Sequence, residues 1–307
     1  MTAAGTLPAR VRMFEVGPRD GLQNQPGEVA TAVKVELIER LAAAGLTEIE
    51  ATSFVSPKWV PQMADNAEVM RAIRRRAGVH YPVLTPNMRG FDDALAAGAD
   101  TVCVFTAASE TFSRRNTNCS IADSLARIEP IAEAAARNGV RMRGYISCVL
   151  GCPYEGEVAP TIVADIAARL DALGAYEISL GDTVGFGTPL KARALVGAVA
   201  ERVPVARLAA HFHDTYGQAL ANLLAVLETG VAVIDSSVGG LGGCPYARGA
   251  KGNVATEDVL YMLDGMAIET GVDLDAVVAV AWWIFDRLGR RPESRVALAR
   301  GAAGESA

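Results

Sequence analysis

Short apolar runs alternate with longer segments of helical periodicity along nearly the whole chain. Residues 11–16 form the first apolar run and end at a Gly-Pro pair, which is typical of a strand followed by a turn. Residues 31–44 then carry apolar side chains at helical spacing and stop at Gly45, a favoured position just after a helix. The same order repeats, with strands predicted at 11–16, 49–51, 81–84, 101–106, 142–150, 177–180, 207–212 and 232–236. The helices between and after them are predicted at 31–44, 64–77, 89–97, 161–173, 189–203, 219–228, 256–263 and 274–288. One more helix is predicted after the strand at 101–106, where it follows a long polar loop and ends at residue 138.

This pattern predicts the fold class. The strands lack polar alternation, which indicates that both of their faces are buried, and repeated strand-helix units favour a parallel sheet. Eight units in about 290 residues fit a (β/α)8 TIM barrel with an extra C-terminal helix. A doubly wound open sheet is the alternative, but it usually carries G-x-G-x-x-G after its first strand, and residues 17–21 read GPRDG. We therefore expect one catalytic domain over 1–307, with a barrel at about 11–265, a helical extension at about 266–290 and a flexible tail at about 299–307.

Composition narrows the class of protein. The 307 residues are 50% hydrophobic and 21% charged, as in ordinary globular domains. A formal charge of −6 gives no basic footprint for nucleic acid. The longest apolar run, near residues 276–285, is too short to span a bilayer. Five cysteines without C-x-x-C spacing, and no apolar leader in residues 1–10, favour reduced thiols in the cytoplasm.

Two of the three histidines stand together, directly after the apolar run 208–210. His211 and His213 are two residues apart, so on a strand their side chains point to the same face, with Cα atoms about 6.6–7 Å apart. Imidazoles at that spacing can close on one metal ion. Two hydrogen-bonded core histidines are the other interpretation. The position of the pair at a strand end, before a glycine-containing turn, favours metal.

Other polar side chains follow the predicted strands in the same way. In a TIM barrel the chemistry lies on the loops after the strands. Singly, each residue has a structural explanation: a carboxylate in a turn, an ion pair in the barrel, or a small buried thiol. Their joint placement at one end of the barrel indicates a site. The residues are Arg19, Asp20, Glu50, Arg143, Ser179, Asp182, Thr183, His211, His213, Cys244 and Asn253.

Six segments carry a resemblance to a known family. They are residues 15–24 (EVGPRDGLQN), 50–63 (EATSFVSPKWVPQM), 144–154 (GYISCVLGCPY), 211–218 (HFHDTYGQ), 239–247 (GGLGGCPYA) and 252–258 (GNVATED). Together they resemble the 3-hydroxy-3-methylglutaryl-CoA lyases, metal-dependent carbon–carbon lyases built on TIM barrels. The resemblance runs from about residue 12 to residue 288.

The resemblance implies cleavage of 3-hydroxy-3-methylglutaryl-CoA to acetyl-CoA and acetoacetate. It implies a divalent ion, Mg²⁺ or Mn²⁺, and an acyl-CoA substrate. It also implies a homodimer that binds neither nucleic acid nor a membrane. It also implies three sets of site residues. The metal ligands are Asp20, His211, His213 and Asn253; the catalytic residues are Arg19, Asp20, Glu50, Asp182, His211 and Cys244; and the substrate-binding residues are Arg19, Arg143, Ser179 and Thr183.

The implied chemistry explains these residue types. Arg19 can stabilise the thioester enolate left by cleavage, and Cys244, in a glycine-rich segment suited to a lid, can protonate it. The base that takes the hydroxyl proton is either His211 or Asp20. Three alternatives stay open: the same chemistry on another branched 3-hydroxyacyl-CoA, the condensing direction, and a metal-binding barrel without catalysis.

Overall fold

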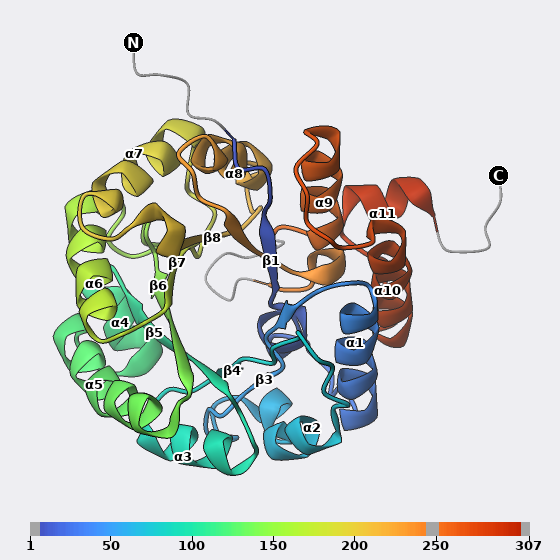
Figure 1. The fold of residues 1–307 in the computed structure, drawn as a ribbon, viewed down its shortest axis with the longest axis horizontal. Coiled ribbons are helices and arrows are strands. Elements are labelled where there is room, and N and C mark those ends of the chain that lie inside the picture. The colour runs from blue at the N-terminus through green and yellow to red at the C-terminus, as the bar shows by residue number, and fades with distance from the viewer. Residues whose placement is uncertain (1–6, 244–251, 302–307) are drawn as a thin grey trace.

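A ring of parallel strands surrounded by helices makes up the computed structural model, which describes residues 7–243 and 252–301 (Figure 1). The strands are hydrogen-bonded in the order β2-β1-β9-β8-β7-β6-β5-β4-β3, and every pair is parallel. Their bounds are β1 Arg12–Glu15, β2 Glu48–Ile49, β3 Thr52–Ser53, β4 Val83–Leu84, β5 Thr101–Ala107, β6 Arg141–Ser147, β7 Glu177–Asp182, β8 Leu208–Phe212 and β9 Val233–Ser236.

The two ends of this order, β2 and β3, are halves of one strand interrupted at Glu50 and Ala51. The interruption still bonds to both neighbours, because the Glu50 N–H donates to the Glu15 carbonyl at 2.8 Å and the Ala51 N–H to the Pro82 carbonyl at 2.9 Å. The sheet therefore closes on itself as eight strands. This closure confirms the predicted (β/α)8 barrel.

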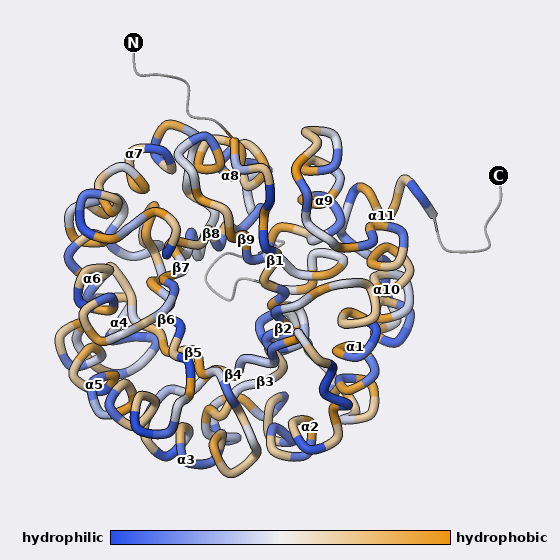
Figure 2. Tube along the Cα trace, in the orientation of Figure 1, coloured by the Kyte–Doolittle hydropathy of each residue, from blue (hydrophilic) through white to orange (hydrophobic). Residues whose placement is uncertain are grey.

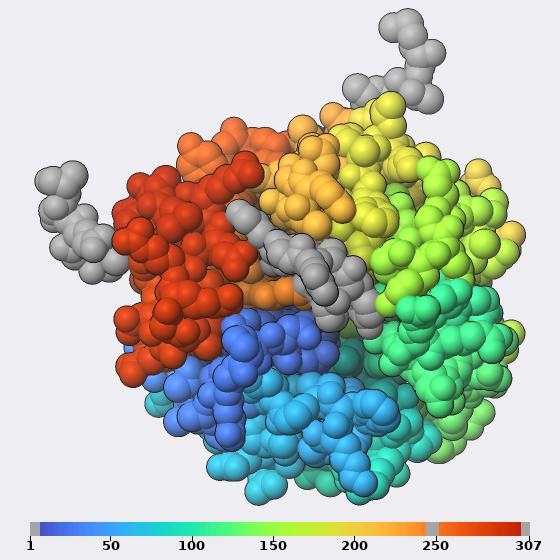
Figure 3. All heavy atoms as spheres, turned by 180° about the vertical axis from the view of Figure 1, so that it is seen from behind, coloured from blue at the N-terminus to red at the C-terminus, as the bar shows by residue number. Residues whose placement is uncertain are grey.

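Helices follow the strands around the outside, and the chain colours run in sequence around the ring (Figure 3). Hydrophobic and hydrophilic residues alternate along these outer helices, as expected when one face packs on the strands (Figure 2). The α-helices are α1 Thr31–Ala43, α2 Asn66–Ala72, α3 Met88–Ala96, α4 Glu110–Thr117, α5 Ile121–Asn138, α6 Pro160–Ala172, α7 Pro189–Ala200, α8 Ala219–Leu227, α9 Thr256–Gly265, α10 Leu274–Arg287 and α11 Arg295–Arg300. Shorter helical turns are η1 Gly17–Gly21, η2 Pro61–Met63, η3 Val205–Arg207 and η4 Val238–Gly240.

The additions at the C-terminus are α10, which packs against α1 and α9, and α11, which packs against α9 and α10. The helix predicted at 274–288 is thus present. Helix α11 extends to Arg300, and most of the flexible tail predicted at about 299–307 lies outside the described residues. None of the helices within 7–243 and 252–301 is long and apolar enough to cross a membrane.

Two differences from the predicted elements stand out: one helix ends earlier than predicted, and one helix was not predicted. The helix expected to reach residue 77 ends at Ala72, because Ile73 adopts an extended conformation (φ −60°, ψ 127°). The segment after β5, predicted to be a polar loop, contains α4. The Ser109 side chain caps the α4 N-terminus by accepting from the Phe112 N–H, and Asn118 ends the helix with a left-handed φ of 53°. Its sequence has little apolar periodicity, so only the caps indicate a helix.

Most of the hydrophobic core lies between the strands and the helices. A second, smaller apolar cluster combines strand residues of the barrel and consists of Phe14, Val16, Leu84, Cys103, Tyr145, Ala209 and Val233. Charged side chains share this interior: Arg143 is fully buried and its guanidinium lies 3.8 Å from the centre of the Phe14 ring. The barrel interior is therefore a mixed polar and apolar layer on which the site at the strand ends rests.

Candidate active site

Three potential metal ligands come together where β1 and β8 end. Oxygen or nitrogen atoms of Asp20, His211 and His213 all lie within 4.8 Å of one another. Asp20 lies in the tight turn η1 after β1, and the two histidines lie at the end of β8, with ring centres 5.4 Å apart. The Asn253 side-chain amide donates to Asp20 at 2.7 Å, and the Asn253 backbone bridges to that of His213. The structure thus brings all four predicted ligands to one place.

The protonation of these groups suits a divalent ion. Burial alone would raise the pKa of Asp20, but the positive charge of Arg19 and the two histidines outweigh burial and lower it to about 2. Burial and the neighbouring His211 lower the pKa of His213 to about 4. The His213 Nδ1 is buried without a hydrogen-bond partner in the described part of the chain. An ionised carboxylate and a neutral imidazole are the forms in which these side chains ligate metals.

Arg19 lies beside the cluster and is held by two carboxylates. Its guanidinium donates to Glu50 and to Asp20, each at 2.6 Å, and only 7% of the residue is exposed. Glu50 is fully buried in the gap between β2 and β3, and burial raises its pKa against the opposing charge of Arg19. One Glu50 oxygen, Oε1, has no hydrogen-bond partner among the described residues. Arg19 is therefore a fixed positive charge at the barrel mouth.

Tyr145 is a site residue that the sequence patterns did not single out. Its ring lies edge-on to His211, with ring centres 6.0 Å apart, and 5.7 Å from the Arg19 guanidinium carbon. The buried phenol oxygen makes no hydrogen bond within the described ranges, and burial raises its pKa well above the usual range. Tyr145 thus keeps a protonated hydroxyl group available beside the cluster. The available signal was its spacing of two residues from Arg143 on one strand.

Two predicted substrate-binding residues lie within the barrel instead of joining the cluster. Arg143 donates to Glu177 at 2.7 Å and to both oxygens of Asp235, at 2.6 and 3.0 Å. Ser179 donates to Asp235 at 2.8 Å, and Arg143, Ser179 and Asp235 are all at most 2% exposed. These side chains are occupied by Asp235, so direct substrate contact is not the role that their geometry favours. Asp235 itself was missed, although it is a carboxylate inside an apolar strand.

Asp182 and Thr183 support the loop after β7. The Asp182 carboxylate accepts the backbone N–H of Phe186 at 3.1 Å and of Gly187 at 2.8 Å, and burial raises its pKa to about 6. A Cβ at Gly187 would lie 2.7 Å from this carboxylate, so glycine is needed there. The Thr183 hydroxyl accepts the Cys148 N–H at 2.9 Å. The structure therefore gives both residues a loop contact, and their catalytic and substrate roles stay predictions. Cys244 lies outside the described residues.

Two buried carboxylates hold the backbone that follows β9. Glu15 accepts the N–H of Val238 at 2.9 Å and the Thr256 hydroxyl at 2.6 Å, and Glu257 accepts the N–H of Gly239 at 2.8 Å. Both carboxylates are fully buried. Burial raises the pKa of Glu15 to about 7 and that of Glu257 to about 8. Below these values the two side chains are neutral in the folded protein.

Stability should therefore fall as the pH rises from about 5 to 8. A glutamate with an ordinary pKa of 4.5 when unfolded and about 8 when folded makes the native state bind more protons in this window. Each such group contributes a slope of at most about 1.4 kcal/mol per pH unit. Glu257→Gln, which keeps an acceptor for the Gly239 N–H, should flatten the slope. Urea unfolding at several pH values measures it, and a slope equal to that of the wild type would contradict the assigned protonation of Glu257.

Comparison with known proteins places this geometry in a family. The family model described as HMGL-like matches residues 10–284. A curated relative from Pseudomonas aeruginosa, named 3-hydroxy-3-isohexenylglutaryl-CoA/hydroxy-methylglutaryl-CoA lyase, is 59% identical over 293 residues. The alignment covers 95% of this chain and 98% of that protein.

Solved structures agree with the fold. A crystal structure of hydroxymethylglutaryl-CoA lyase from Pseudomonas aeruginosa superposes with a TM-score of 0.94 at 59% identity, covering 96% of this chain and 98% of that one. An HMG-CoA lyase from Acinetobacter baumannii, solved in complex with coenzyme A and 3-methylmalate, superposes with a TM-score of 0.92 at 35% identity, and 97% of each chain is covered.

Proposed function

The chain belongs to the HMGL-like family, and from this premise we propose that it is a hydroxymethylglutaryl-CoA lyase. It cleaves 3-hydroxy-3-methylglutaryl-CoA to acetyl-CoA and acetoacetate. A curated relative and a solved structure, each 59% identical to this chain, are named for this activity. The match covers 98% of the length of each. The structural observation that supports it most is the cluster of Asp20, His211 and His213 beside the buried Arg19. An acyl-CoA substrate fits the coenzyme A complex of the 35% identical structure.

The family depends on a divalent metal, and the donor set here fits one. Two imidazoles, a carboxylate and an amide oxygen make a mixed nitrogen and oxygen site of low charge, which suits Mg²⁺ or Mn²⁺. Asp20, His211, His213 and Asn253 would hold the ion. When bound, it supplies Lewis-acid chemistry by polarising the substrate hydroxyl and carboxylate.

The side chains of the protein account for the remaining steps. A base removes the proton of the tertiary hydroxyl, the C2–C3 bond breaks to leave a ketone, and the electron pair passes to the thioester as an enolate. Arg19 places its fixed charge where the enolate oxygen develops. The Tyr145 hydroxyl, which has no hydrogen-bond partner in the described ranges, can donate a hydrogen bond nearby. Cys244 is the proposed donor that protonates the enolate carbon to give acetyl-CoA.

Three residues are candidates for the base that takes the proton of the substrate hydroxyl. His211 and Asp20 were both predicted from the sequence. Asp20 is a weak base, because its pKa is about 2. Glu50 is a third candidate, since its Oε1 has no hydrogen-bond partner among the residues that the structure describes and burial raises its pKa. A catalytic role of Asp182 and a substrate-binding role of Thr183 remain part of the proposal, as do the homodimer and a cytoplasmic location. Arg143 and Ser179 face Asp235, so substrate contact is not proposed for them.

The direct test is product formation from purified protein with Mn²⁺ or Mg²⁺. Chromatography should detect acetyl-CoA and acetoacetate in equal amounts from 3-hydroxy-3-methylglutaryl-CoA. A parallel assay uses a 3-hydroxy-3-isohexenylglutaryl thioester, because the name of one relative includes that substrate. Faster cleavage of the longer thioester would reassign the substrate but keep the chemistry. Failure to cleave any branched 3-hydroxyacyl-CoA, by protein that binds metal, would instead favour a non-catalytic barrel.

A further inference from the structure

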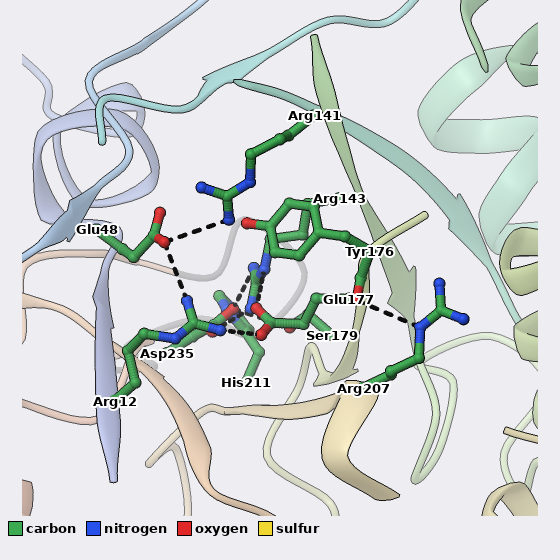
Figure 4. Close-up of polar contacts among 10 residues, drawn as sticks. All are labelled: Arg12, Glu48, Arg141, Arg143, Tyr176, Glu177, Ser179, Arg207, His211 and Asp235. Atoms are coloured by element: carbon green, nitrogen blue, oxygen red, sulfur yellow. Dashed lines mark hydrogen bonds and ion pairs between the residues drawn. The ribbon is translucent and has the colours of Figure 1, made fainter. Parts of the chain in front are cut away.

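A chain of ion pairs, buried except at Arg12, runs through the barrel from its N-terminal end to His211 of the proposed metal site (Figure 4). At the start, Arg12 pairs with Glu48 and with Glu177. Glu177 pairs with Arg143, and Arg143 pairs with Asp235. Asp235 then reaches the ring of His211, with 3.2 Å between Oδ2 and Nδ1. The strand register explains these contacts, since His211 lies opposite Asp235 on β9, and Arg143 lies opposite Glu177 on β7.

We propose that Asp235 is a positioning residue that fixes the proton of His211 on Nδ1 and so leaves Nε2 unprotonated for the metal ion. A neutral imidazole has one N–H donor and one free nitrogen, and the hydrogen bond made by one nitrogen decides which it is. The Asp235 carboxylate can only accept, and it faces Nδ1. Carboxylates that orient metal-ligating histidines in this way are a general device of metal sites.

Asp235 is itself held so that it cannot turn away from His211. Arg143 donates to both of its oxygens, and the Ser179 hydroxyl donates to the oxygen that faces the histidine. Burial alone would raise the pKa of Asp235, but Arg143 and His211 outweigh it and keep the pKa below its usual range. Tyr145 packs edge-on against the histidine ring and restricts its plane. Arg143 and Ser179 thus act indirectly: they hold Asp235, and Asp235 orients the proposed ligand His211.

The position of the His211 proton limits which residue can act as the base. With Nδ1 protonated toward Asp235 and Nε2 directed at the ion, His211 orients the ion and does not take the hydroxyl proton. Asp20 and Glu50 then remain as candidates. This proposal rests on the metal site and not on the identity of the substrate, so a different acyl-CoA would leave it unchanged.

The test reads the tautomer of His211 in metal-free protein. With only three histidines in the chain, ¹⁵N-histidine labelling gives few ring signals, and each is assigned with its own His→Gln variant. At a pH above the histidine range, wild-type His211 should carry its proton on Nδ1. A wild-type signal with the proton on Nε2 would overturn the proposal without any further variant.

Asp235→Ala tests the cause. The His211 signals should change to those of a tautomer mixture, and the affinity for Mn²⁺, measured by titration calorimetry, should fall by about 10- to 100-fold. The matched control is Glu48→Ala, which removes another buried carboxylate that pairs with arginines but does not contact His211. It should leave tautomer and Mn²⁺ affinity unchanged. An equal loss in both variants would show general loosening of the barrel and overturn the proposal.

Should Asp235→Ala fail to fold, Ser179→Ala keeps the carboxylate and removes one of its donors. Because Arg143 still holds both oxygens of Asp235, the lost hydrogen bond should weaken Mn²⁺ binding by only roughly 2- to 10-fold, while His211 keeps the Nδ1 proton. A Ser179→Ala protein with the Mn²⁺ affinity of the wild type, or with a shifted tautomer, would contradict the network.

Discussion

Chelation of divalent ions with EDTA should abolish thioester cleavage, and excess Mg²⁺ or Mn²⁺ should restore it. His213→Ala should abolish cleavage in a way that added metal does not restore, because it removes one of four proposed ligands. Its loss of Mn²⁺ affinity should exceed the roughly 10- to 100-fold loss expected when a residue that hydrogen-bonds to a ligand, such as Asp235, is replaced. The fold should survive, since the site lies at the strand ends and not in the core between strands and helices. Titration calorimetry with Mn²⁺ and an activity assay measure the two effects.

His80→Ala is the matched control. His80 is the third histidine and lies before β4, where its backbone N–H donates to the Thr47 carbonyl and its side chain is 40% exposed. The same substitution there should leave Mn²⁺ affinity and cleavage unchanged. Full activity of the wild type in the presence of chelator would contradict the metal site altogether.

Arg19→Met should lower kcat by about 10²-fold or more with little change in KM. The reason is that Arg19 is fixed by Glu50 and Asp20 before the substrate arrives, so its charge acts chiefly on the negative charge that develops during cleavage. Steady-state kinetics with 3-hydroxy-3-methylglutaryl-CoA separate the two constants. A raised KM with kcat preserved would reassign Arg19 to binding of the substrate ground state.

The substitution also leaves Glu50 buried without its strongest partner, which should raise its pKa further. A control for this loss is Arg141→Met, which removes another barrel arginine paired with a buried glutamate, Glu48. That pair lies at the N-terminal end of β6, away from the cluster. Its kcat should match that of the wild type, and a comparison of urea unfolding in the two variants isolates the structural cost.

The fold and the histidine pair of the proposed metal site could be predicted because both depend on local patterns, whereas the family resemblance implied Asp20 and Asn253 as further ligands. Strand-helix repetition predicts the barrel, and the strand ends of a barrel share one face, so His211 and Asp20 could be expected to meet. The roles of Arg143 and Ser179 could not be obtained in this way. Their partner is Asp235, more than 50 residues away in the chain, and only the register between β6, β7, β8 and β9 places it beside them.

Two helices were predicted incorrectly: α2 ends before the predicted residue 77, and α4 was predicted to be a loop. The basic run after α2 has good helix formers, yet Ile73 turns extended where the chain heads back toward β4. Helix α4 lies on the surface with a largely polar sequence, so hydrophobic periodicity did not reveal it. The end of α2 at Ile73 is therefore not indicated by its local sequence, whereas the two ends of α4 are set by the local caps Ser109 and Asn118.

Closure of the ring between β1 and β9 has a consequence for the order of folding. The pairing joins Arg12 to Val233, and the contact between Asp20 and Asn253 spans 233 positions of the chain. Contacts between such distant residues form slowly, after the local strand-helix units. During synthesis we expect β1 to keep an unpaired edge until residues near 236 leave the ribosome, a period in which open strand edges favour aggregation. The metal ligands on the first and last units would thus be among the last parts of the molecule to meet.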